Sequence, residues 1–189
     1  MKRITALITA AVMMVSLSAC GNKTEEVQLT PEQLYGMSGV LVDNGVFNAF
    51  CPEGWTDEPQ YTLEQQTEAS LMTDVLQFVK EDSEEEASES DTDAPFIVIQ
   101  YVPVKEDLIA PDSSYYNEVE RVAAFTTGGY NWSGYYAYVE GHKFAYLTTS
   151  TDEAQYAVTV WLQNDGSGVT LEDDDVKAIL SSIALTEEE

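Results

Sequence analysis

Few side chains of this sequence have the types and spacing that catalysis requires. His142 is the only histidine among the 189 residues, so a Ser-His-Asp arrangement would have to use it as its base. It follows Gly141 at an expected hairpin tip, where a nucleophile is hard to orient. The segment 36–39, Gly-Met-Ser-Gly, lacks the second spacing of a nucleophile elbow and is a turn. We therefore predict no catalytic residue and a protein that is not an enzyme.

The chain is rich in oxygen ligands and poor in nitrogen and sulfur ligands. It contains 34 Asp and Glu residues but two Cys and one His, whereas zinc sites need clusters of Cys and His. The acidic run 81–93, or residues 165–168 followed by 172–175, could bind calcium, although neither has the EF-hand spacing. Two carboxylates could also form a glycosidase pair, but the sequence does not give their separation. We expect no metal and no cofactor, with calcium binding or carboxylate-based hydrolysis as alternatives.

Aromatic side chains concentrate between residues 130 and 161. Four of them, Tyr130, Trp132, Tyr135 and Tyr136, lie in the expected meander at both odd and even positions, so some should face away from the core. Exposed tyrosine and tryptophan anchor protein interfaces and sugar-binding platforms. The alternative is cross-strand packing beneath helices. These four residues are the candidate binding surface that the sequence predicts.

Charge and composition exclude one class of partner and favour one folded domain. The formal net charge is −26, with only 8 Lys and Arg residues. Nucleic-acid affinity depends mainly on Lys and Arg that neutralise phosphates, so we expect no nucleic-acid partner. Hydrophobic residues make up 44% of the chain and aromatic residues 11%, which is enough to fill a single core.

The N-terminus has the order of an export signal. Lys2 and Arg3 precede the apolar run 4–15, which is shorter than the roughly 20 residues that a membrane-spanning helix needs. The next residues, Leu-Ser-Ala-Cys at 17–20, resemble the lipobox of bacterial lipoproteins. The resemblance implies that residues 1–19 are a cleaved signal peptide and that Cys20 carries a diacylglycerol. The mature protein would then be exported and anchored to the bacterial cell membrane or the outer membrane.

The second cysteine, Cys51, loses its only disulfide partner in the chain if Cys20 is lipidated. Free cysteine is among the most buried residue types, and the neighbours of Cys51 are Phe50 and Pro52. We therefore predict a buried and inert thiol.

The remaining pattern predicts the elements that position these residues. Residues 20–38 are expected to form a lipidated tether with a short helix, and 39–186 a single domain with a disordered acidic loop at 81–93. The segment 74–80 fits a strand or a helix. A turn is predicted at 52–55, strands at 46–50, 95–104, 132–139, 143–150 and 155–163, and helices at 112–127 and 176–183.

This order of elements resembles the PsbP-like fold. The features that match are the turn Pro-Glu-Gly-Trp at 52–55, a middle helix, an antiparallel meander and a last helix at 176–183. The resemblance covers about residues 40 to 185 and implies an α+β sandwich, in which helices cover an antiparallel β-sheet. It also implies a binding or assembly role without a shared catalytic residue. We expect a lipoprotein outside the cytoplasm that binds a protein or surface component, with glycan or calcium binding as the alternative.

Overall fold

The computed structural model describes the central part of the chain, and the signal segment, the lipobox with Cys20 and most of the tether lie outside it. The acidic loop is described only at its first residue, Glu81, which is exposed. Within the described residues, no helix has the length and apolar character needed to cross a bilayer. The described residues are 36–64, 68–71, 74–81, 94–108, 111–139, 141–162 and 169–186.

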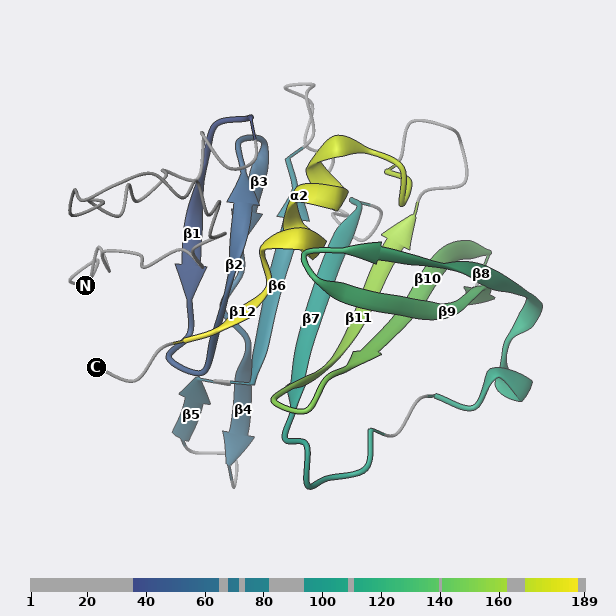
Figure 1. Ribbon diagram of the computed structural model, residues 1–189, viewed down its shortest axis with the longest axis horizontal. Coiled ribbons are helices and arrows are strands. Elements are labelled where there is room, and N and C mark those ends of the chain that lie inside the picture. The colour runs from purple at the N-terminus through teal and green to yellow at the C-terminus, as the bar shows by residue number, and fades with distance from the viewer. Residues whose placement is uncertain are drawn as a thin grey trace, which may run out of the picture.

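Seven antiparallel strands form the main sheet, in the order β3-β6-β7-β11-β10-β9-β8 (Figure 1). Consecutive hairpins join β9, β10 and β11, which confirms the predicted meander, and the ambiguous segment 74–80 is a strand. The bounds are β3 (Trp55–Asp57), β6 (Val75–Lys80), β7 (Phe96–Val102), β8 (Asn117–Thr127), β9 (Tyr130–Val139), β10 (His142–Ser150) and β11 (Gln155–Leu162).

Two smaller sheets and one helix complete the described structure. A three-stranded sheet contains β1 (Gly39–Asp43), β2 (Phe47–Pro52) and β12 (Ala184–Leu185), and a two-stranded sheet contains β4 (Tyr61–Glu64) and β5 (Glu68–Leu71). The helix α2 (Asp174–Ser182) contacts β2 and, more weakly, β8. Figure 1 shows the β8-β9 hairpin crossing in front of β7, β11 and β10, with its tip beside α2.

The predicted α+β sandwich, a sheet covered by helices as in the PsbP-like fold, is wrong. Among the described residues α2 is the single α-helix, and strands account for most of the rest. The expected middle helix at 112–127 is instead a single 3-10 turn, η1 (Ser113–Tyr115), followed by strand β8. The protein is therefore mostly β.

The structure shows why the hydrophobic pattern of residues 117–127 resembles that of a helix although the segment is a strand. Two register shifts between β8 and β9 break the regular alternation of a strand. The spacing of Tyr115, Val119 and Val122 fits a helical face, yet Val122 is 4% exposed while Val119 and Tyr115 are 43% and 85% exposed. Gly128 and Gly129 have φ angles of 60° and 81°, and they form the tip of the β8-β9 hairpin rather than a helix end.

The main core lies between the inner face of the seven-stranded sheet and the layer formed by β2 and α2. The helix buries Val176, Ile179 and Leu180 in this core, and its position confirms the helix predicted at 176–183. Asp173 is the N-cap residue of the helix, and its carboxylate bonds back to Thr170. Thr170 donates both its N–H and its hydroxyl hydrogen to the Asp173 carboxylate, at 2.9 and 2.8 Å.

The last described residues are attached to an early strand. β12 pairs antiparallel with β2, and the backbone N–H of Thr186 donates to the carbonyl of Val46 at 3.0 Å. The backbone N–H of Phe50 donates to the hydroxyl of Ser182 at 2.7 Å in a buried position. Strand β2 is therefore held by residues from the far end of the domain.

The Cys51 thiol is buried, as the sequence predicts. Its side chain in β2 is 3% exposed, and its sulfur donates a weak hydrogen bond to the carbonyl of Trp55 at 3.4 Å. Burial raises the pKa of Cys51 to about 12, with smaller contributions from the charges of Asp57 and Glu81. Only the thiolate attacks thiol reagents. The low exposure of Cys51 and its raised pKa therefore both slow the reaction.

We expect Cys51 to react with a maleimide only after unfolding. A Cys20→Ser variant makes Cys51 the sole thiol, and labelling is then followed by mass spectrometry in native buffer and in urea. The expected result is no labelling of the native protein and one label per unfolded chain. Rapid labelling of the folded protein would contradict the buried position.

Candidate functional site

The structure does not bring the four predicted aromatic residues together on one face. Trp132 is fully buried in the main core, and Tyr130 and Tyr136 pack against the same core. Tyr135 points to the opposite, outer face of the sheet, where it joins a second apolar cluster. Only Tyr135 of the predicted set therefore lies on the face that the main core does not use.

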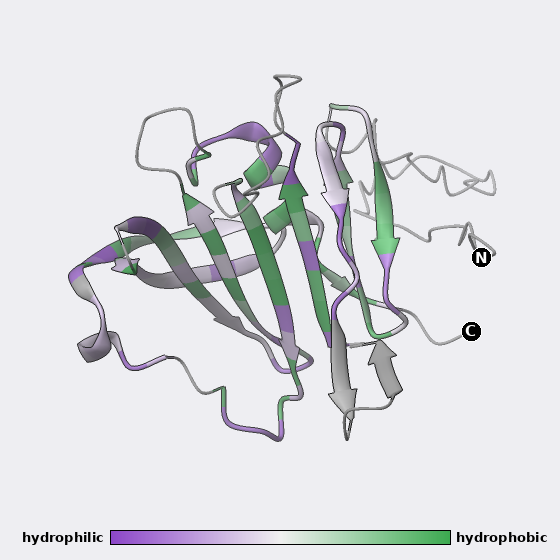
Figure 2. Ribbon diagram, turned by 180° about the vertical axis from the view of Figure 1, so that it is seen from behind, coloured by the Kyte–Doolittle hydropathy of each residue, from purple (hydrophilic) through white to green (hydrophobic). Residues whose placement is uncertain are grey.

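The outer face carries a row of rings across four neighbouring strands, which we call the aromatic ladder: Phe96 on β7, Trp161 on β11, Phe144 on β10 and Tyr135 on β9. Ring centroids are 5.3 Å apart for Phe96 and Trp161, 6.2 Å for Trp161 and Phe144, and 6.3 Å for Phe144 and Tyr135. His142 also stacks on Trp161, at 5.5 Å. Figure 2, which views the sheet from behind, shows hydrophobic residues along β6 and β7 with single hydrophilic breaks.

Phe96, Trp161 and Phe144 stack on one another through their flat ring faces. Strand β11 lies between β7 and β10, so Phe96 and Phe144 flank Trp161 on opposite sides. The interplanar angles are 12° and 14°, which means that both pairs are nearly parallel. The ladder therefore presents ring edges outward rather than the flat ring face on which a sugar stacks.

Residues 103–108 and 111–116 cover one half of the outer face. Leu108 and Tyr116 pack against the cluster that contains Phe144, and the hydroxyl of Tyr135 donates to the carbonyl of Pro111 at 3.2 Å. Phe144 is buried beneath this segment, whereas Phe96 and Trp161 on the other half are only partly buried. The less covered part of the face, which we call the open part, therefore lies over β6, β7 and β11 at the partly buried side chains of Val79, Phe96, Val98, Thr159 and Trp161, whereas Val75 and Ala157 are buried.

The outer face is neutral and has acidic borders. The outward positions of β6, β7, β11, β10 and β9 contain no Asp, Glu, Lys or Arg. On the covering segment, Glu106, Asp107 and Asp112 are exposed, against one basic residue, Lys105. On the β3 side, Glu58 accepts a hydrogen bond from the side chain of Gln77 at 3.4 Å.

The hydroxyls of Tyr135 and Tyr146 on the covered half remain protonated at neutral pH. Burial raises the pKa of Tyr135 to about 12, and Tyr116, Tyr146 and Asp112 contribute further. Burial also raises the pKa of Tyr146. These two tyrosines therefore add no negative charge to the outer face at neutral pH.

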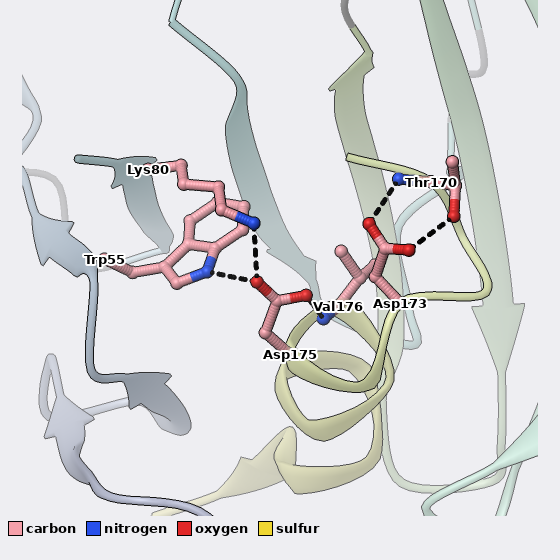
Figure 3. Close-up of polar contacts among 6 residues, drawn as sticks. All are labelled: Trp55, Lys80, Thr170, Asp173, Asp175 and Val176. Carbon is pink, nitrogen blue, oxygen red and sulfur yellow. Dashed lines mark hydrogen bonds and ion pairs between the residues drawn. The ribbon is translucent and has the colours of Figure 1, made fainter. Parts of the chain in front are cut away.

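A second polar cluster has a structural role, since it fixes α2 to the main sheet (Figure 3). One oxygen of Asp175 accepts hydrogen bonds from the indole N–H of Trp55 at 2.8 Å and from Lys80 at 3.0 Å. Its other oxygen accepts from the backbone N–H of Val176 at 2.8 Å. Burial disfavours the charge of Asp175, but these bonds and the charge of Lys80 outweigh it and lower the pKa of that carboxyl.

The lowered pKa of Asp175 predicts acid-dependent stability. A carboxyl whose pKa is lower in the folded protein stabilises the fold above its ordinary pKa, and the stabilisation disappears as pH falls through the folded value. We expect Asp175→Asn to cost about 2 kcal/mol at pH 7. The difference from wild type should shrink below about pH 4.

Urea unfolding at a series of pH values tests this expectation. Asp174→Asn is the matched control, because it removes a charge from the same first helical turn at an exposed position. A wild-type advantage over Asp175→Asn that does not change between neutral and acidic pH would contradict the role of the ionised carboxylate.

The described residues give little support to catalysis through His142 or to metal binding. His142 lies partly buried against Trp161, and within the described ranges no three His, Cys, Asp or Glu side chains are grouped to hold a metal ion. Residues 163–168 and 82–93, the main parts of the two predicted calcium loops, lie outside the description. An open groove of about 310 Å³ beside α2 is lined by Met37, Thr127 and Lys177, among others, and we assign it no ligand.

Solved structures similar to this chain include two distant neighbours. No family model and no curated protein matches the chain. A protein from Bacteroides thetaiotaomicron VPI-5482 has a TM-score of 0.43 and 9% identity, covering 80% of this chain and 49% of its own. LpqN from Mycobacterium tuberculosis, which is involved in cell envelope biogenesis, has a TM-score of 0.46 and 15% identity, covering 79% and 91%. The chain thus spans about half the length of the first neighbour, and its function must be argued from its own residues.

The aromatic ladder was missed in the sequence because its members lie on four separate strands. Part of the signal was present, since His142, Phe144 and Tyr146 alternate along one strand and share a face. The decisive information is the register, which places Phe144 opposite Trp161 and Tyr135 beside Phe144. A count of aromatic residues in one segment could not supply it.

Proposed function

We propose that the mature protein is a non-catalytic binding module, held at a bacterial membrane by a lipid on Cys20, that binds a protein partner through the outer face of its main sheet. The observation that carries the proposal is the aromatic ladder. Its open members, Phe96 and Trp161, lie on a face that the main core does not use. Aromatic residues are enriched among the anchors of protein interfaces.

The ring geometry favours a protein partner over a glycan. A sugar platform needs an accessible flat ring, and both faces of Trp161 are already covered by Phe96 and Phe144. Ring edges with neighbouring aliphatic side chains, such as Val98, form the kind of apolar floor that packs against side chains of another protein.

The lipid anchor is tested by Cys20→Ala. The wild-type chain should incorporate a radiolabelled fatty acid and sediment with membranes. The variant should incorporate none of it and should lose the processing step after Ala19. Equal labelling of the two proteins would refute lipidation at Cys20.

The binding face is tested by photo-crosslinking in the native membrane. A photoreactive amino acid replaces Val98, at the centre of the open face, where its register partner is Thr159 on β11. The matched control is the same replacement at Val40, which is 62% exposed on β1. We expect a discrete protein adduct from position 98 that position 40 does not give. Thr159→Arg should remove the adduct, because it places bulk and charge on the face without removing a ring. A position-98 pattern identical to that from position 40 would refute the proposal.

A further inference from the structure

The open part of the outer face has the width of one helix. It extends over three neighbouring strands, β6, β7 and β11. Strands lie about 4.8 Å apart, so the strip is about 10 Å wide, which matches the diameter of about 10 Å for an α-helix with its side chains. An apolar sheet face is normally buried against a helix or a second sheet. In the described residues the helix α2 covers the inner face, and none covers this strip.

The direction of the backbone hydrogen bonds excludes a simple added strand. The N–H and C=O groups of a sheet lie in its plane, so only an edge strand can pair with an extended peptide. Strands β7 and β11 are paired on both edges, and β6 is paired with β7 on one edge and, over Phe78–Lys80, with β3 on the other. The occupant of this strip must therefore satisfy its own backbone, as a helix does.

Charge determines which kind of helix fits. The floor of the strip is neutral. The exposed Glu58 lies beside β6, and the exposed Glu106 lies at the start of β11, where its backbone carbonyl accepts a hydrogen bond from the side chain of Gln155 at 3.0 Å. The formal net charge of the chain is −26. A second copy of this chain would bring the same acidic surface, and its α2 is fixed in its own core. A helix with an apolar stripe and flanking Lys or Arg residues is complementary to both features.

We infer that the partner binds with a basic amphipathic helix that lies across β6, β7 and β11, its apolar stripe on Val98 and the edges of Phe96 and Trp161, and its basic flanks beside the acidic borders. The inference rests on the proposed function and specifies the partner's binding element. Helices of this kind are commonly recognised by apolar grooves.

Peptide binding to the full mature lipoprotein, held in phosphatidylcholine nanodiscs, tests the inference. Three labelled peptides of about five helical turns are compared by fluorescence anisotropy, with empty nanodiscs as the blank. They are an amphipathic Leu/Lys helix, a scrambled isomer of the same composition, and a Leu/Glu helix. We expect the Leu/Lys helix to bind at least about tenfold more tightly than its isomer, and the Leu/Glu helix not to bind.

Two variants locate the binding. Thr159→Arg on the strip should weaken binding of the Leu/Lys helix about tenfold, and the matched Val40→Arg on β1 should leave it within about twofold. Equal binding of the scrambled isomer would show attraction by net charge alone and would overturn the inference. Unchanged affinity of Thr159→Arg would place the peptide elsewhere and would also overturn it.

The crosslink from position 98 separates this inference from the function on which it rests. An adduct that maps to a basic amphipathic helix of the partner supports both. An adduct that maps to an acidic or extended segment overturns the helix inference and leaves the proposed function in place. Absence of a specific adduct overturns both.

Discussion

Replacement of Gly134 by alanine is expected to prevent the chain from folding. A Cβ atom at this position would overlap the carbonyl oxygen of Tyr146 and lie 2.8 Å from its carbonyl carbon. Both atoms belong to the backbone of β10, so no side-chain rotation can relieve the contact. Strand β9 would have to separate from β10, where Gly134 pairs with Leu147. We expect a loss of more than about 4 kcal/mol, or no folded protein at all.

Circular dichroism and urea unfolding measure this effect, with Gly129→Ala as the control. Gly129 has a φ of +81°, but no atom lies within 4 Å of an added Cβ, so only backbone strain applies. That strain costs about 1–2 kcal/mol. If Gly134→Ala lost no more stability than Gly129→Ala, the close approach of β9 and β10 would be refuted.

Replacement of Trp132 by alanine is expected to cost about 3–5 kcal/mol of stability. The side chain is fully buried and packs edge-to-face on Tyr130, with ring centroids 5.9 Å apart. Its indole N–H has no hydrogen-bond partner, so apolar burial is its main contribution. The large cost follows because alanine leaves most of the indole volume empty.

Two further variants separate this core role from a surface role. Trp132→Phe keeps a ring and removes the unpartnered N–H, so it should lose much less stability than Trp132→Ala. Tyr115→Ala, at a residue 85% exposed, should change the free energy of unfolding by no more than about 0.5 kcal/mol. Urea unfolding followed by far-UV circular dichroism compares all three. A loss for Trp132→Ala as small as that for Tyr115→Ala would contradict the buried position.

Local pattern predicts the elements in which one period dominates. The alternation in β7 correctly assigns Ile97 and Ile99 to one face and Phe96 and Val98 to the other, and the spacing of Val176 and Ile179 correctly predicts α2. The prediction for β8 is wrong because two register shifts disrupt the two-residue period of this strand. The helix wrongly predicted at 112–127 is one of the features on which the α+β sandwich prediction rests.

The binding surface depends on information that no single segment contains. Alternation separates Tyr135 from Tyr136, but it does not say which of the two faces the core. That choice is made by α2 and β2, which cover one side of the sheet. The stacking of Phe96 on Trp161 depends on the pairing of β7 with β11, two strands far apart along the chain.

The attachment of the last described residues to β2 has a consequence for the timing of folding. The bonds from Phe50 to Ser182 and from Thr186 to Val46 join residues more than a hundred positions apart. Such non-local contacts slow folding, because the closure entropy of a long loop is lost before they form. A chain still emerging from a ribosome or a translocon lacks β12 and α2 and cannot complete the layer around β2. For the exported lipoprotein that we propose, the layer around β2 can therefore be completed only when the C-terminal segment lies on the same side of the membrane as β2.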